Sequence, residues 1–353
     1  MVRNLKLKLA AGAAFLCAFG LFAYNPPAGG ENLPGIAGPV IFNTASSTVG
    51  GAFYDVAPSS IAFNPALPAF EQRNVLDAGF TMIHCSEDPE DKSLGGAFET
   101  GIMVPTKWGV GTAELFGAYV PFYEMQLGKV VGLKYAASRD VTDNLAVGAG
   151  FTAGYLWGYS TDFIAAADLG FVYNMGDFAF FKDFRFGASL MNLGKTFTST
   201  EVWGIKGKEA DVYPGIATVR AGAAGTFFEK DDFAAAVSAD ISVPMAQNFI
   251  LDTGLQFKFK DFVTFSTSWQ YNAQEVAEDC KCWMPSVGLT FKFLLNSKDN
   301  AFMKENGWQQ SEVAVSGAYK KMYEHINAVS GGVKLNLGMK DTQAPKIKLF
   351  DEK

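Results

Sequence analysis

Few residues of this chain have the types and spacing that catalysis or metal binding requires. Cys280 and Cys282 are one residue apart, but no histidine lies near them to complete a metal site, so an incidental pair in a loop is the simpler interpretation. A Ser–His enzyme needs a base beside its nucleophile, and Ser86, near His84, precedes an acidic run (residues 87–91) typical of a solvated loop. We therefore expect no enzyme, catalytic residue, metal site or cofactor.

The dominant pattern is an alternation of apolar and polar residues that recurs along most of the chain. In residues 249–259, for example, Leu255 and Phe257 alternate with Gly254 and Gln256. Successive side chains of a strand point to opposite faces, so each run has one apolar face. Runs of this kind, about 10 residues long and separated by turns, are typical of transmembrane barrels. The expected fold is all-β, a transmembrane antiparallel β-barrel of about 14 strands.

The strands are expected to begin near positions that follow turn residues. These starts are Val75, Ser93, Trp108, Gly128, Asn144, Asp162, Phe184, Ile216, Asp232, Phe249, Phe262, Met284, Glu312 and Ala328. An even number of strands brings both ends of the barrel to the periplasm, with short turns on that side and longer loops outside. The long inner connection at residues 294–311 is an exception to this asymmetry.

Composition and the N-terminus indicate the compartment. Only 18% of the residues are charged and the net charge is −7, which excludes nucleic acid as a partner. Arg3, Lys6 and Lys8 precede an apolar stretch, the layout of a cleaved secretory signal peptide. We expect a signal peptide (residues 1–23), an N-terminal hatch or plug (24–74), the barrel (75–340) and a C-terminal tail (341–353), in the outer membrane of a diderm bacterium.

Charged residues share the strand face opposite the bulky apolar residues. A charge facing lipid at mid-depth would cost about 2–4 kcal/mol, so this face is expected to line the lumen. The luminal polar residues are Glu99, Lys134, Asp168, Arg185, Arg220, Asp240, Asp252 and Lys258. They either hold a plug through pairing or form a polar ladder that guides a substrate.

Residues 24–74 lack alternation and are rich in Pro, Gly, Ser and Ala, so they are the natural occupant of the lumen. Residues 47–57 are expected to form a short helix. Asn64 is suited to satisfy free backbone groups at a turn, and Pro65 stops the preceding helix.

Residues 50–69, with the sequence Asn64-Pro65-Ala66, resemble the N-terminal hatch of the FadL superfamily, including its PorV-like branch and an uncharacterised spirochaetal branch. The resemblance implies a 14-stranded barrel with the hatch in its lumen and an opening at a kinked third strand, which Gly117 and Pro121 would form. It also implies ligand or hatch roles for a short set of residues, namely Phe63, Asn64, Pro65, Ala66 and Phe70.

The resemblance favours passive uptake of hydrophobic small molecules, such as long-chain fatty acids, through the plugged lumen. The alternative is a PorV-like scaffold for secretion or surface attachment, which the long connection at residues 294–311 and the tail favour; an open porin is a third interpretation. Expected partners are outer-membrane lipid and a fatty acid-like ligand, with a protein partner at the extracellular loops or C-terminal tail for the scaffold.

Overall fold

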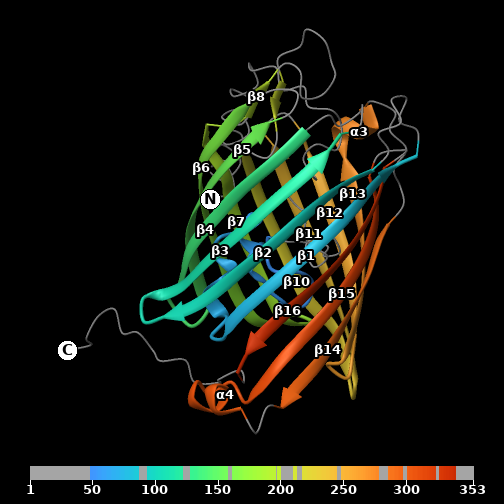
Figure 1. Ribbon diagram of the computed structural model, residues 1–353. Helices are drawn as coiled ribbons and strands as arrows, with labels where there is room; N and C mark the ends of the chain where they lie inside the picture. Colours follow the sequence, from blue (N-terminus) through green and yellow to red (C-terminus); the bar gives the residue numbers. More distant parts are fainter. Residues whose placement is uncertain are drawn as a thin grey trace, which may run out of the picture.

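The computed structural model describes residues 48–86, 94–121, 128–157, 161–195, 197–199, 210–212, 217–244, 248–277, 285–296, 300–322 and 326–338. Fourteen antiparallel strands close into a barrel, in the order β1-β16-β15-β14-β13-β12-β11-β10-β7-β6-β5-β4-β3-β2 (Figure 1). Closure joins the first strand to the last, with Asn74 opposite Leu337 and Cys85 opposite Ile326. The expected signal peptide and C-terminal tail lie outside the described residues.

The barrel strands are β1 (Asn74–Cys85), β2 (Leu94–Thr106), β3 (Gly109–Val120), β4 (Gly128–Asp140), β5 (Leu145–Trp157), β6 (Asp162–Phe178), β7 (Phe181–Lys195), β10 (Thr218–Lys230), β11 (Phe233–Pro244), β12 (Ile250–Phe259), β13 (Val263–Asn272), β14 (Ser286–Asn296), β15 (Gln310–Met322) and β16 (Ile326–Leu337). A separate two-stranded sheet pairs β8 (Phe197–Ser199) with β9 (Ala210–Val212). The helical elements are η2 (Pro58–Ala62), η3 (Leu67–Phe70), α3 (Ala273–Ala277) and α4 (Ala301–Glu305).

The alternation in the sequence predicted the strands well. Each barrel strand begins within three residues of its expected start, and the closed antiparallel barrel is confirmed. The predicted faces are also correct. Phe80, Leu133 and Phe151 are at least half exposed on the outer surface, whereas Lys134 and Asp168 are buried on the inner one. An apolar exterior around charged interior residues reverses the arrangement of a soluble protein and suits contact with lipid.

None of the described helices has the length and apolar character needed to cross a membrane.

The two ends of the barrel differ in their connections. Both barrel termini, Asn74 and Leu337, lie at the end where β2–β3, β10–β11 and β12–β13 are joined by tight turns. Trp108 and Phe180 are strongly exposed in turns at this same end, as expected for aromatic residues at a membrane interface. Short turns mark the periplasmic side of such barrels, so this end is assigned to the periplasm.

One local expectation was wrong. The described part of residues 47–57 forms turns rather than a helix, because Gly50 and Gly51 take positive φ angles of 81° and 89° that end helical geometry. The connection expected at residues 294–311 is shorter than its predicted bounds but is still too long for a simple turn, as expected. Strand β14 continues to Asn296, β15 begins at Gln310, and α4 lies between them.

Candidate functional site: a hatch segment in the barrel lumen

Residues 48–73, here called the hatch segment, lie inside the barrel. The Thr48 backbone N–H donates to Asp240 Oδ2 on β11 at 2.9 Å, and the Phe53 N–H donates to Gln256 Oε1 on β12 at 2.8 Å. On β7, Ser189 Oγ donates to the Phe63 carbonyl at 2.6 Å. Further contacts reach β1, β6, β14 and β16, so the wall holds the segment from several sides. Figure 1 shows its blue ribbon behind β1–β4, within the barrel.

A tight turn at the start of the segment is held by Arg185. Gly50 and Gly51 direct backbone carbonyls toward β7, where the Arg185 guanidinium donates to the carbonyls of Val49 at 2.8 Å, Ala52 at 2.8 Å and Gly51. Arg185 is 3% exposed. A buried guanidinium is stable only when acceptors replace water, and the hatch carbonyls do this.

Asp55 forms the second ionic contact of this turn. Its carboxylate pairs with Lys334 on β16 and with Lys292 on β14, the latter at 3.0 Å. Lys334 Nζ also donates to the Val56 carbonyl at 3.1 Å. Burial raises the pKa of Asp55, but the two lysines outweigh this and hold it well below its usual range. We call this region, residues 48–55 with Arg185, Lys292 and Lys334, the turn anchor.

Asn64 joins the hatch segment to itself and to the wall. Its side-chain amide donates to the Thr48 carbonyl at 2.8 Å and to the Phe171 carbonyl of β6 at 3.1 Å. Its Oδ1 accepts from the Ala66 N–H at 3.0 Å. Asn64 is fully buried, and these bonds satisfy both ends of its amide. The predicted turn role of Asn64 is therefore confirmed.

Glycines of the wall let the hatch backbone approach closely. A Cβ at Gly148 of β5 would overlap the Pro65 carbonyl, and one at Gly170 of β6 would overlap Asn64 Oδ1. On β2, a Cβ at Gly101 would overlap Pro58. These inward-facing glycines form a seat in which even an alanine would displace the segment.

The helix η2 rests on an acidic part of the wall. Ser59 Oγ donates to Asp77 Oδ2 of β1 at 3.2 Å, and Glu99 of β2 and Glu114 of β3 are buried beside it. Asp77 Oδ1 and Glu114 Oε2 are buried and have no hydrogen-bond partner among the described residues. We call η2 with Asp77, Glu99 and Glu114 the helix seat.

An apolar cluster buries the C-terminal part of the hatch segment. Leu67 and Ala66 pack with Val75, Met103 and Val172 of the wall. Tyr54 and Phe70 border this cluster, and their rings meet edge to face with centroids 6.1 Å apart. Burial raises the pKa of Tyr54, whose hydroxyl donates to the Leu67 carbonyl.

The predicted luminal residues all lie on inward-facing positions, but only some touch the hatch segment. Arg185 and Asp240 bond to it, and Arg220 and Lys258 stack cations on its aromatic rings: the Arg220 Cζ lies 4.6 Å from the Phe63 centroid, and the Lys258 Nζ lies 5.4 Å from that of Phe53.

Glu99 belongs to the helix seat, and the other predicted residues interact within the wall. Asp168 accepts from Thr152 Oγ1 at 3.1 Å and from the Asn192 N–H at 2.6 Å, where the β6–β7 ladder shifts register. Asp252 accepts from Gln270 at 2.8 Å. Lys134 lies 5.2 Å from the Phe116 ring centroid, beside the helix seat with Glu99. The predicted polar ladder is thus interrupted by residues that serve the wall.

The third strand, β3, pairs with β2 and β4 without a register shift along its length. The ladder is continuous at Gly117, and Pro121 is buried just beyond the strand. The register shifts lie instead on β6, β7, β10 and β11. An opening at Gly117 and Pro121 stays a prediction, and the described pairing gives it no support.

Sequence reasoning missed Asp55, the residue that both lysines bind. A signal was present, because Asp55 is the one charged residue between Thr48 and Phe70. A lone charge in a segment assigned to a lumen needs a partner of opposite sign. Lys292 and Lys334 have the required inward parity.

Comparisons with known proteins agree with this architecture. No model of a known protein family and no curated protein sequence matches the chain. Among solved structures, the monoaromatic hydrocarbon channel CymD is 15% identical, with a TM-score of 0.51 over 88% of this chain and 100% of that one. A deletion mutant (deltaS2S3) of the monoaromatic hydrocarbon channel TodX is 11% identical, with a TM-score of 0.52 over 86% of this chain and 99% of that one. The protein has the fold of a FadL-like outer-membrane barrel.

Proposed function

We propose that this protein admits hydrophobic small molecules passively across the outer membrane, and that the hatch segment closes the lumen at rest. The observation that carries the proposal is the seating of residues 48–73 by polar bonds to strands around the barrel. An open porin would leave this cross-section to water. The hydrocarbon channels that share the fold support the same class of permeant.

The surface of the hatch segment favours a ligand with an apolar chain and an anionic head, such as a long-chain fatty acid. Phe53 and Phe63 are partly buried, and each has a wall cation over its ring, Lys258 and Arg220 respectively. A ligand carboxylate can take the place of the Phe63 ring as the partner of Arg220, while the ring packs against the apolar chain. Lys258 already pairs with Asp261 at 2.6 Å, so Arg220 is the proposed site of the head group.

A reversible cross-link tests the proposal. Ser59 Oγ and Asp77 Oδ2 lie 3.2 Å apart, so η2 and β1 are in contact at this pair. A Ser59→Cys/Asp77→Cys protein, made in a background without the native cysteines and shown by mass spectrometry to form the disulfide, ties the hatch segment to β1. Uptake of labelled oleate by cells carrying only this variant should fall to the level of cells without the protein, and recover after a reductant. The Ser59→Cys single variant is the matched control and should be insensitive to reductant.

Two outcomes would contradict the proposal. Oleate uptake that is the same with and without the protein would rule out a role in its transport. Large, steady conductance of the unmodified protein in planar bilayers would show an open pore instead of a closed one.

A further inference from the structure

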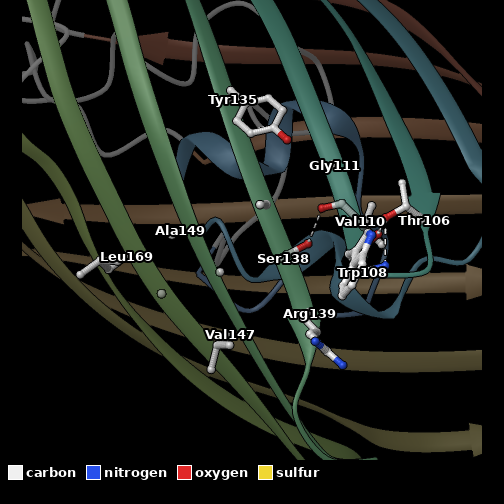
Figure 2. A pocket seen from close by; sticks show the side chains of 14 residues that line it. Thr106, Trp108, Val110, Gly111, Tyr135, Ser138, Arg139, Val147, Ala149 and Leu169 are labelled. Carbon is white, nitrogen blue, oxygen red and sulfur yellow. Dashed lines mark hydrogen bonds between the residues drawn. The ribbon is translucent and has the colours of Figure 1, made fainter. Parts of the chain in front are cut away.

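The outer wall carries a groove that the proposed uptake path does not use. It crosses β3–β6 near the periplasmic end and has a volume of about 680 Å³ (Figure 2). Its floor consists of outward-facing small residues, Gly111 on β3, Ala137 on β4 and Ala149 on β5. Neighbouring strands of this barrel carry large apolar residues on their outer faces, so these small residues leave a depression in the lipid-facing surface.

Large apolar side chains border the groove. Tyr135 and Leu169 are both about half exposed, at 51% and 49%. Tyr135 and Arg139 lie on the same face of β4, four residues apart, which is about 14 Å along a strand. Half of the hydrocarbon core of a bilayer is about 15 Å, so a groove of this length stays within one leaflet.

Arg139 lies at the periplasmic end of the groove, with Trp108 nearby (Figure 2). Its Nε and Nη2 atoms are buried and have no hydrogen-bond partner among the described residues. Trp108 is 72% exposed, as an aromatic residue at the level of lipid headgroups would be. Guanidinium donors that are buried without an acceptor are costly. A phosphate at this end of the groove would supply oxygens in the geometry that a guanidinium prefers, once the Arg139 side chain turns outward to meet it.

We infer that this groove binds a phospholipid of the periplasmic leaflet, with the phosphate on Arg139 and one acyl chain over Ala137 and Ala149. Three observations select this occupant: the cationic donors, their position at the short-turn end, and a groove confined to one leaflet. Basic sites at the membrane surface bind lipid headgroups in this way. The site lies on the outer face of the wall, while Gly148 and Gly170, which also line the groove, contact the hatch segment on the inner face. The inference does not rest on the proposed uptake.

Native mass spectrometry of the purified full-length protein with added phosphatidylethanolamine tests the inference. The unmodified protein should retain one lipid, and Arg139→Gln should retain it about tenfold more weakly, the effect of losing a charge-assisted hydrogen bond. Ala149→Phe fills the groove from the lipid-facing side, leaves every charge in place, and should weaken retention as well.

Lys182→Gln is the matched control, because Lys182 is an exposed cation on β7 outside the groove. Its retention should equal that of the unmodified protein. Equal retention by Arg139→Gln, or an equal loss with Lys182→Gln, would overturn the inference. So would inorganic phosphate that displaces the lipid at matched concentration, since the acyl chain would then contribute nothing.

Discussion

The turn anchor and the helix seat hold the same segment with different chemistry. In the turn anchor, Arg185 meets three hatch carbonyls and Asp55 meets two lysines. In the helix seat, Ser59 bonds to Asp77, while Asp77 Oδ1 and Glu114 Oε2 lack partners among the described residues. A buried charge stabilises a contact only when its partners replace water. The hatch segment is therefore held firmly at its turn and weakly at η2.

Under the proposed function, this difference predicts which part of the hatch segment moves first when the lumen opens. Local opening starts where the free-energy cost is lowest. Lifting η2 breaks the Ser59 contacts and exposes carboxylates that gain water, whereas releasing the turn leaves a buried Arg185 and Lys334 without acceptors. We expect η2 to move first, with the turn anchor as the fixed point.

The largest effect is expected from Arg185→Met. It leaves the carbonyls of Val49, Gly51 and Ala52 without their donor, at about 1 kcal/mol each, so the free energy of hatch opening should fall by about 3 kcal/mol. Hydrogen exchange of the hatch amides measures this change, and bilayer conductance should rise with it. Lys182→Gln, an exposed cation on the same strand, is the control. A closed, fully protected hatch in Arg185→Met would contradict the turn anchor.

Asp55→Asn should have the next largest effect. It should lower the free energy of hatch opening by about 2 kcal/mol, a value between those of exposed and buried ion pairs. It removes the partner of Lys292 and Lys334, so the same exchange measurement should show faster exchange around residue 55. No change would mean that the two lysines are satisfied without the hatch segment.

The depressed pKa of Asp55 also sets a pH window. Its folded pKa lies below the unfolded value of about 4, so its stabilisation is complete above about pH 4 and is lost as pH falls through the lower, folded value. Exchange at the turn anchor, corrected for the intrinsic rate, should therefore stay constant from about pH 7 to about pH 5. Exchange at the turn anchor that becomes faster within that window, in the unmodified protein and in Asp55→Asn alike, would show that a titratable group other than Asp55 controls its stability.

Gly148→Ala should lower the free energy of hatch opening by about 1 kcal/mol, the low end for overpacking, because the new methyl group overlaps the Pro65 carbonyl. Gly317→Ala on β15 is the matched control, since its nearest neighbour would be the Ser330 carbonyl at 3.8 Å. Equal effects of the two substitutions would show that the added methyl group destabilises the barrel in general, and not the contact between Gly148 and Pro65 in particular.

The smallest effect is expected from Glu114→Gln. It should change the free energy of hatch opening by less than about 0.5 kcal/mol, because Glu114 Oε2 has no partner to lose among the described residues. Exchange in η2 is the measurement. A loss as large as that of Asp55→Asn would show that the helix seat is as strong as the turn anchor.

The sequence predicted the barrel better than the site. Alternation recurs along the barrel strands and depends on local geometry alone, so the positions of the 14 barrel strands and the inward parity of their charged residues were predicted correctly. The hatch contacts depend on residues that are distant in sequence, such as Asp55 and Lys334, and no local pattern connects them. The helix expected at residues 47–57 failed because the positive φ angles of Gly50 and Gly51 turn the chain toward Arg185.

Hydrogen exchange of the unmodified protein, resolved to single hatch amides, tests the central claim most directly. The Thr48 and Phe53 amides, which bond to Asp240 and Gln256, should exchange more slowly than the Ser59 and Ser60 amides of η2. Slower exchange in the turn is the predicted result. Equal exchange across the segment, or slower exchange in η2, would contradict a hatch that is anchored at its turn.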